Sequence, residues 1–175
     1  MTLHVPKFCP ECGSSFGGLI PKGGEMTCLQ CGHVHYCNVA GVANLIVPHE
    51  GGIFVQRRGI EPGIGLWGLP GGYMMAGESW QRAAARETRE EIMVEVRWNL
   101  SDIAEHSFGS SYLGHTLVVF GRVMPQASIE VHPFTPHREV LERRLISWRD
   151  WTYFRNQIAF PLHELAIDKY FRSLR

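Results

Sequence analysis

The segment from Gly72 to Val94 constrains this chain more than any other, because it combines a helical pattern with a tight group of acidic residues. Alanines and long charged side chains between Ser79 and Ile92 favour a helix. On that helix, Glu87 lies about one turn from both Glu90 and Glu91. The three carboxylates repel one another unless cations neutralise them.

The positions of these glutamates around the helix distinguish a metal site from an ordinary solvated acidic face. With about 100° per residue, Glu87 and Glu91 project within about 40° of Trp80, whereas Arg82 and Arg89 project to the opposite side. Two of the carboxylates therefore extend an apolar stripe, and a partly buried carboxylate needs a cation. Clustered oxygen ligands suit a hard divalent ion, so the sequence predicts a site for Mg²⁺ or Mn²⁺.

Two close cysteine pairs predict a second metal site near the N-terminus. Cys9 and Cys12 form one C-x-x-C pair, and Cys28 and Cys31 form the other. Each pair can offer two thiolates to one ion, and a hairpin between the pairs would complete the tetrahedron of a structural Zn²⁺ site. The glycines that follow the pairs, Gly13 and Gly32, let backbone N–H groups approach the sulfurs. The alternative is a set of ordinary free thiols, which this spacing disfavours.

The other residues of this N-terminal segment favour a structural role. Because four cysteines complete the ligand set, we expect His33 and His35 at the surface or in packing, and Cys37 as an idle thiol. A zinc ribbon usually stabilises a segment too small to fold alone. A nucleic-acid module is the alternative, but Lys7 and Lys22 are few cations for phosphate contacts.

Composition and charge fit one main globular domain with a small appendage. Hydrophobic residues make up 45% and charged residues 19%, which suffices for a sizeable core. The formal net charge of +0 gives no global field for nucleic acid or an anionic membrane, so we expect neither as a partner. The longest mainly apolar run, 39–47, is too short to span a membrane, and residues 1–8 lack the apolar centre of a signal peptide. A cytoplasmic location is therefore expected.

The remaining elements follow from hydrophobic patterning. A loop rich in glycine and proline is expected at 59–72, and helices at 79–92 and 161–174. Predicted strands cover 39–47, 53–56, 94–98, 115–123 and 141–148.

The acidic segment resembles the Nudix box. That box has a glycine, five residues, a glutamate, seven residues, Arg-Glu, and then a Glu-Glu pair shortly before a glycine and an apolar residue. The matching positions here are Gly72, Glu78, Arg86, Glu87, Glu90, Glu91 and Val94. Two positions depart from the box: Thr88 stands where an aliphatic residue is usual, and Met93 replaces the glycine that ends the helix.

The resemblance implies an α/β fold, the Nudix α/β/α sandwich with a mixed β-sheet, preceded by a small zinc-ribbon domain. It places the ribbon in residues 1–37 and the hydrolase domain in residues 38–175. The cysteine pairs with His35-Tyr36-x-Asn38 resemble the zinc-ribbon subgroup of NADH, FAD and ADP-ribose pyrophosphatases, although Val39 replaces its usual proline. Because the family often forms dimers, a homodimer is one expected assembly.

The resemblance also implies residue roles. Gly71 and Gly72 belong to the loop whose backbone carbonyl joins the metal shell, and a salt bridge between Glu78 and Arg86 holds that loop to the helix. A carboxylate accepts the proton of the attacking water, with Glu90 and Glu142 as the alternatives. The implied Mg²⁺ ligands are Glu87, Glu90, Glu91 and, from the segment Glu139-x-x-Glu142, Glu142.

The implied reaction is Mg²⁺-dependent cleavage of the pyrophosphate in a nucleoside-diphosphate compound. NADH-preferring members carry a Ser-Gln-Pro-Trp-Pro-Phe-Pro-like motif after the box, and residues 101–113 lack it. This favours ADP-ribose or FAD, with release of AMP, over NADH or nucleoside triphosphates. Tyr73, Phe108 and Tyr112 are the candidate stacking partners for a base or flavin, although each could instead belong to the core. A non-catalytic nucleotide sensor is the alternative from another class, and the complete acidic set disfavours it.

Overall fold

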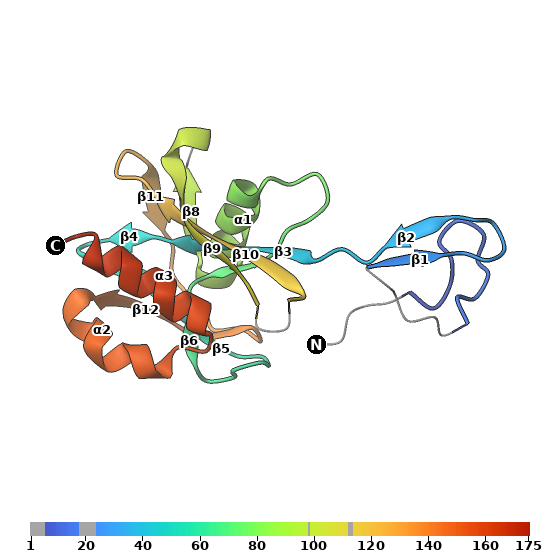
Figure 1. The fold of residues 1–175 in the computed structure, drawn as a ribbon. Coiled ribbons are helices and arrows are strands. Elements are labelled where there is room, and N and C mark those ends of the chain that lie inside the picture. Colours follow the sequence, from blue (N-terminus) through green and yellow to red (C-terminus); the bar gives the residue numbers. More distant parts are fainter. Residues whose placement is uncertain (1–5, 18–23, 98, 112–113) are drawn as a thin grey trace.

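The structure is a computed structural model that describes residues 6–17, 24–97, 99–111 and 114–175 (Figure 1). Its helices are α1 (Trp80–Ile92), α2 (Trp148–Phe154) and α3 (Pro161–Arg172), with short 3-10 turns at Leu100–Asp102 and Arg155–Gln157. Its strands are β1 (Glu25–Thr27), β2 (Val34–Tyr36), β3 (Ala40–Ile46), β4 (Pro48–His49), β5 (Gly52–Arg58), β6 (Trp67–Gly68), β7 (Gly71–Tyr73), β8 (Val94–Arg97), β9 (Ile103–Ser110), β10 (Thr116–Val123), β11 (Ser128–Val131) and β12 (Val140–Ser147).

Two sheets form the centre of the larger part of the molecule. One is mixed, with the order β7-β3-β10-β9, and its β3 and β10 run parallel. The other is antiparallel, with the order β12-β5-β4, and β6 pairs with β5. A separate antiparallel pair joins β11 to β8.

Helices cover both faces of this arrangement, as Figure 1 shows. Residues Ala83, Ala84 and Ile92 of α1 pack with alternate residues of β3, including Ala43 and Leu45, in one buried cluster. On the other face, α2 and α3 pack on β10 and β12 through Trp151, Phe171 and Ile167, together with Phe120 and Ile146. Because side chains alternate along a strand, β3 and β10 contribute to both layers. This is the predicted α/β/α arrangement with a mixed sheet.

Specific contacts fix the two ends of α1. At the start, Ser79 Oγ accepts a hydrogen bond from the Arg82 backbone N–H at 3.3 Å. At the end, Met93 takes a left-handed conformation with φ of 55°, and its N–H donates to Arg89 O at 3.1 Å. Methionine thus occupies the backbone region that favours glycine, and the helix still ends where the Nudix box would end it.

Arg143 of β12 caps a free carbonyl at the C-terminal end of α1. Its Nη1 donates to Ile92 O at 2.8 Å and to His132 O at 3.0 Å. The guanidinium also lies over the rings of Phe54 and Phe134, with its Cζ 5.5 Å from each centroid. A cation at this position is favoured by the helix dipole and satisfies a carbonyl that has no partner within the helix.

The N-terminal hairpin β1–β2 lies apart from the two larger sheets and leads directly into β3 (Figure 1). It has its own small cluster of buried residues, in which Phe16 and Met26 pack with Cys9 and Cys28. Gly13 and Gly32 have φ of 72° and 75°, so the predicted backbone turns after the cysteine pairs are present.

The predicted helices and strands are found, but several elements were missed, including β6 and β7, which lie within the segment 59–72 that was expected to be a loop. The prediction placed no element at β9 or β11, and it ended a strand at Trp148, where the structure begins α2. Residue 98, the expected end of one strand, lies outside the described residues. Within the described ranges, no helix has both the length and the hydropathy required to cross a membrane.

We expect Arg143→Met to lower the free energy of unfolding by about 2 kcal/mol, because two charge-assisted hydrogen bonds to carbonyl oxygens are lost. Urea denaturation followed by circular dichroism measures this change. The matched control is Arg97→Met, whose guanidinium makes an exposed ion pair with Glu130 at 2.9 Å. Its expected effect is below about 0.5 kcal/mol. Equal losses in the two variants would contradict the capping role of Arg143.

Candidate functional site

Glu91 is the most buried carboxylate of the acidic cluster, with 8% of the residue exposed. Its Oε2 accepts hydrogen bonds from Gln56 Nε2 at 2.8 Å and from the Gly71 backbone N–H at 2.7 Å. Burial raises the pKa of Glu91 to about 7, although both donors act in the opposite direction. A divalent cation beside this carboxylate would relieve the cost of its burial.

Glu87 lies directly against the backbone of β7, at the glycine that begins the box. A Cβ placed on Gly72 would lie 2.7 Å from the Glu87 carboxyl carbon, so any side chain there would displace the carboxylate. Burial raises the pKa of Glu87, and the neighbouring Arg86 lowers it in part. The sequence prediction that Glu87 and Glu91 point inward is met, since the Glu91 carboxylate accepts from the Gly71 N–H and the Glu87 carboxylate lies against Gly72.

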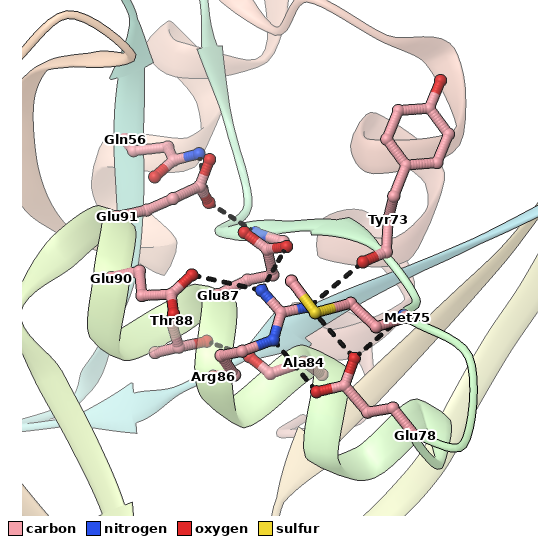
Figure 2. A network of polar contacts seen from close by, with 11 residues as sticks. Gln56, Tyr73, Met75, Glu78, Ala84, Arg86, Glu87, Thr88, Glu90 and Glu91 are labelled. Carbon is pink, nitrogen blue, oxygen red and sulfur yellow. Dashed lines mark hydrogen bonds and ion pairs between the residues drawn. The ribbon is translucent and has the colours of Figure 1, made fainter.

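Arg86 connects the helix to the loop and to the other glutamates (Figure 2). Its Nε and Nη2 donate to the two oxygens of Glu78 at 2.9 and 3.0 Å. Its Nη1 donates to Glu87 at 2.7 Å and to Glu90 at 3.1 Å, and Nη2 also donates to Tyr73 O at 3.1 Å. The hydrogen bond from Arg86 is the main reason that the pKa of Glu78 is lowered. This is the geometry expected of the predicted Glu78–Arg86 salt bridge.

The oxygen-rich set formed by Glu87, Glu90 and Glu91 fits a hard divalent cation. The carboxylates arise from about one helical turn, and the glycines of β7 leave room beside them because they carry no side chains. Their roles as ligands remain a proposal, as does that of a backbone carbonyl from Gly71 or Gly72.

Glu142 is placed differently from the other predicted ligands. It lies on β12, and its Oε1 accepts a hydrogen bond from Arg144 Nε at 3.0 Å. Glu139, the first residue of the same Glu-x-x-Glu segment, acts electrostatically on both Glu87 and Arg58. The Coulombic effect of Glu139 on Glu87 makes Glu139 an acidic neighbour of the cluster, while the role of Glu142 stays a prediction.

The predicted aromatic residues are not gathered in one place. Tyr73 ends β7, and Phe108 lies on β9, at the opposite edge of the four-stranded sheet. Three strand spacings of about 4.8 Å place these edges about 14 Å apart. Tyr73 is 46% and Phe108 69% exposed, and the Tyr73 ring points away from the carboxylates (Figure 2). Tyr112 lies outside the described residues.

Several residues of the site were missed by sequence reasoning. Gln56 was assigned to the end of a strand, and nothing in its local pattern shows that it meets a helix 35 residues later. His163 of α3 accepts a hydrogen bond from the Leu69 N–H at Nδ1, 3.0 Å away, and so fixes the loop that precedes the box. Burial lowers the pKa of His163 to about 3, which keeps the ring neutral and able to accept.

The four paired cysteines converge on one point, as predicted. Their sulfurs all lie within 4.8 Å of one another, with 3.7 Å between Cys9 and Cys31 and 3.6 Å between Cys12 and Cys28. Zinc–sulfur bonds of about 2.3 Å in a tetrahedron separate the sulfurs by about 3.8 Å. The spacing therefore fits a Zn²⁺ ion.

Hydrogen bonding shifts the pKa values of these thiols in different directions, and the pKa of Cys31 is raised because the other cysteines and burial outweigh the backbone hydrogen bond from His33. Hydrogen bonding from Ser14, at 3.1 Å from the sulfur, lowers the pKa of the Cys28 thiol to about 6. A lowered pKa favours the thiolate, which is the form that binds metal. Backbone N–H groups at Ser14 and His33 hydrogen-bond to Cys12 and Cys31, so the expected approach of backbone N–H groups to sulfur is present.

Comparison with known proteins gives a family match and several relatives. The model of the NUDIX domain matches residues 38–165. The NAD-capped RNA hydrolase NudC of Stutzerimonas stutzeri is 26% identical over 160 residues, covering 80% of this chain and 54% of the relative. That of Pseudomonas aeruginosa is 29% identical over 154 residues, with coverage of 80% and 54%. The chain thus spans about half the length of these curated relatives.

A solved structure supports the same fold over nearly the whole chain. The crystal structure of a NUDIX hydrolase from Nitrosomonas europaea has a TM-score of 0.77 and 28% sequence identity, and the match covers 96% of this chain and 92% of that one. With the cysteine cluster, this similarity confirms the predicted fold class, a Nudix α/β/α arrangement whose N-terminal cysteines are consistent with a zinc ribbon.

We expect the purified protein to contain about one zinc per chain, and Cys28→Ser to lose most of it, because three ligands hold Zn²⁺ less tightly than four. Elemental analysis of protein prepared without chelator measures the content. Cys37→Ser is the control, because this thiol is not in the four-sulfur cluster. Its zinc content should match that of the unaltered protein. Zinc-free protein under these conditions would contradict the assignment.

Proposed function

The chain belongs to the Nudix hydrolase family, and from this premise we propose that it is a divalent-metal-dependent enzyme that cleaves the pyrophosphate of a dinucleotide or nucleoside-diphosphate derivative. Family membership and the NudC relatives support the predicted pyrophosphohydrolase class. The observation that carries the proposal is the placement of Glu87 and Glu91 against the backbone of Gly71 and Gly72. Such a set of oxygens can hold a cation beside a phosphate.

In the proposed mechanism, Glu87 and Glu91 hold the cation, with Glu90 at the exposed side of the cluster. A bound Mg²⁺ or Mn²⁺ would neutralise phosphate charge and lower the pKa of a bound water. The Glu90 side chain is 52% exposed, and one of its oxygens pairs with Arg86 at 3.1 Å. It is therefore accessible to water, which suits the role of proton acceptor. Glu142 of β12 remains the alternative from the sequence, and the electrostatic interaction of Glu139 with Glu87 makes it a further candidate.

Arg86 has a different role in this mechanism. It makes two hydrogen bonds to Glu78 and reaches the backbone of Tyr73, so it holds the loop at a fixed distance from the helix. Its contacts with Glu87 and Glu90 reduce the repulsion among the carboxylates. Proper alignment of water and phosphate depends on this rigid frame.

For the substrate, we favour ADP-ribose or FAD, with AMP as a product. The support is the dinucleotide-cleaving subgroup suggested by the cysteine pairs, together with the absence from residues 101–113 of the motif found in NADH-preferring members. The names of the relatives support a second candidate, an NAD-containing substrate such as NAD-capped RNA. RNA therefore belongs among the partners to be tested, contrary to the expectation from net charge alone.

We also propose that residues 1–37 form a zinc-stabilised domain and residues 38–175 the hydrolase domain. The separate buried cluster around Cys9 and Cys28 supports this division. Because a zinc site of this kind contributes folding free energy, loss of the metal should unfold the ribbon and leave the rest largely intact.

We expect Glu87→Gln and Glu91→Gln each to reduce turnover by at least about 100-fold, because each removes a charged metal ligand without a change in volume. Steady-state hydrolysis with Mg²⁺ measures the effect, and circular dichroism checks the fold. Glu130→Gln is the matched control, since its side chain is 46% exposed and lies on β11. Turnover near that of the unaltered protein in either test variant would remove its residue from the metal site.

We expect ADP-ribose or FAD to be cleaved faster than NADH, giving AMP with ribose 5-phosphate or FMN. A panel of dinucleotides, nucleoside triphosphates and NAD-capped RNA, with products separated by chromatography, tests this order. Hydrolysis in ¹⁸O-water then locates the attacked phosphorus from the product that carries the label. Faster cleavage of NAD-capped RNA would establish the second candidate. Release of pyrophosphate from triphosphates, with dinucleotides untouched, would contradict both.

A further inference from the structure

Gln56 of β5 lies beneath the acidic cluster and is almost completely buried, with 2% of the residue exposed. Its Nε2 donates to Glu91 Oε2 at 2.8 Å (Figure 2). Its Oε1 is buried and accepts no hydrogen bond from the described parts of the chain. A buried amide with one unsatisfied oxygen costs free energy, and an apolar residue of similar size would avoid that cost.

The orientation of this amide is fixed by its neighbour. If the amide were reversed, Gln56 Oε1 would face the Glu91 carboxylate, and two acceptors would repel each other. The amide group therefore serves Glu91, and its own second polar atom remains without a partner. A buried group in this condition points to a function other than stability.

The second donor to Glu91 acts on the same oxygen. The Gly71 N–H reaches Oε2 at 2.7 Å. A Cβ on Gly71 would lie 2.3 Å from Ala43 O and 2.5 Å from Asn44 Cα, so this backbone N–H is held in place by close packing on β3. Each carboxylate oxygen has about two acceptor directions, and on Oε2 both are used. Oε1 is the oxygen left for a cation.

We propose that Gln56 is a positioning residue that, together with the Gly71 N–H, holds Oε2 of Glu91 and directs Oε1 toward the divalent cation. This inference rests on the proposed function, because it assumes that Glu91 is a metal ligand. Without Gln56 the carboxylate can rotate about its terminal bond, and the ligand oxygen loses its fixed direction. Outer-shell partners of this kind typically alter metal affinity by about 10- to 100-fold.

The test is the affinity for Mn²⁺ alone, measured by electron paramagnetic resonance on the zinc-loaded full chain. We expect Gln56→Met, which keeps the unbranched shape but loses the donor, to weaken Mn²⁺ binding by about 10-fold. In the hydrolysis assay, the Mg²⁺ concentration for half-maximal rate should rise by a similar factor, and kcat at saturating Mg²⁺ should largely recover. A residue with only a packing role would not raise the Mg²⁺ requirement while leaving kcat at saturating Mg²⁺ largely unchanged. Gln56→Leu serves as a second variant if the first folds poorly.

The matched control is Thr88→Val, which also replaces a fully buried polar group by an apolar one. Thr88 Oγ1 donates to Ala84 O at 2.7 Å within α1, so its hydroxyl is engaged by the helix backbone and not by a carboxylate. This variant should keep its Mn²⁺ affinity within about 2-fold. Thermal unfolding in the absence of Mn²⁺ reports the stability of both variants separately.

The variant Glu91→Gln distinguishes failure of the positioning role of Gln56 from failure of the metal-binding role of Glu91. If Glu91→Gln loses Mn²⁺ binding but both Gln56 variants bind it within about 2-fold of the unaltered protein, the positioning role is overturned and the proposed function stands. If Glu91→Gln itself binds Mn²⁺ normally, the metal role of Glu91 is wrong, and the inference about Gln56 falls with it.

Discussion

The close contact between the carboxylates of α1 and the bare backbone at Gly71 and Gly72 is the constraint on which the site depends. A side chain at either glycine would collide, with Glu87 in one case and with the β3 backbone in the other. Since the helix and the loop are separate elements, this contact must be held from several sides. Arg86 ties the loop to the helix, His163 fixes the loop from α3, and Arg143 fixes the far end of the helix.

The same contact determines the electrostatic environment of the glutamates on α1. Arg86 is shared among Glu78, Glu87 and Glu90, whereas Glu91 is held by neutral N–H donors and a more distant Arg58. Burial raises the pKa of Glu91 to about 7, above the ordinary carboxyl value of about 4.3. In the metal-free protein, the folded state therefore binds the proton more tightly than the unfolded state, and stability falls as the pH rises between these values. A cation bound to the carboxylate opposes this loss, so metal binding and stability are linked.

Local sequence patterns determined the parts of the fold that could be predicted. The helix expected at 79–92 is observed at Trp80–Ile92, because its N-cap, alanines and acidic stripe all lie within the segment. In contrast, β9 contains a glycine, an alanine and a glutamate, which are poor strand formers, and its strand conformation comes from pairing with β10. Only the first residue of α2, Trp148, was assigned, as the end of a strand, since aromatic residues favour strands when considered alone, and the rest of α2 was not predicted. Gln56 could be placed on its strand, but its contact with Glu91 arises only when two distant segments pack.

The arrangement of the predicted aromatic residues, on which substrate specificity was expected to depend, could not be predicted from local sequence patterns either. Laterally paired residues share a face of the sheet, and Tyr73 pairs with Val42, which packs on the α3 side. Phe108 pairs with Val119, and Val119 pairs with Ala43, which packs on the α1 side. The two rings therefore lie on opposite faces as well as opposite edges, and one base cannot stack on both.

Arg58 brings a cation near Glu91. It follows Gln56 on the same face of β5, and its guanidinium carbon lies 4.9 Å from the Phe160 ring centroid. Recognition of the group beyond the proposed pyrophosphate would thus depend on strand register and helix packing, whereas most residues of the proposed reacting centre lie in one helix and the loop before it.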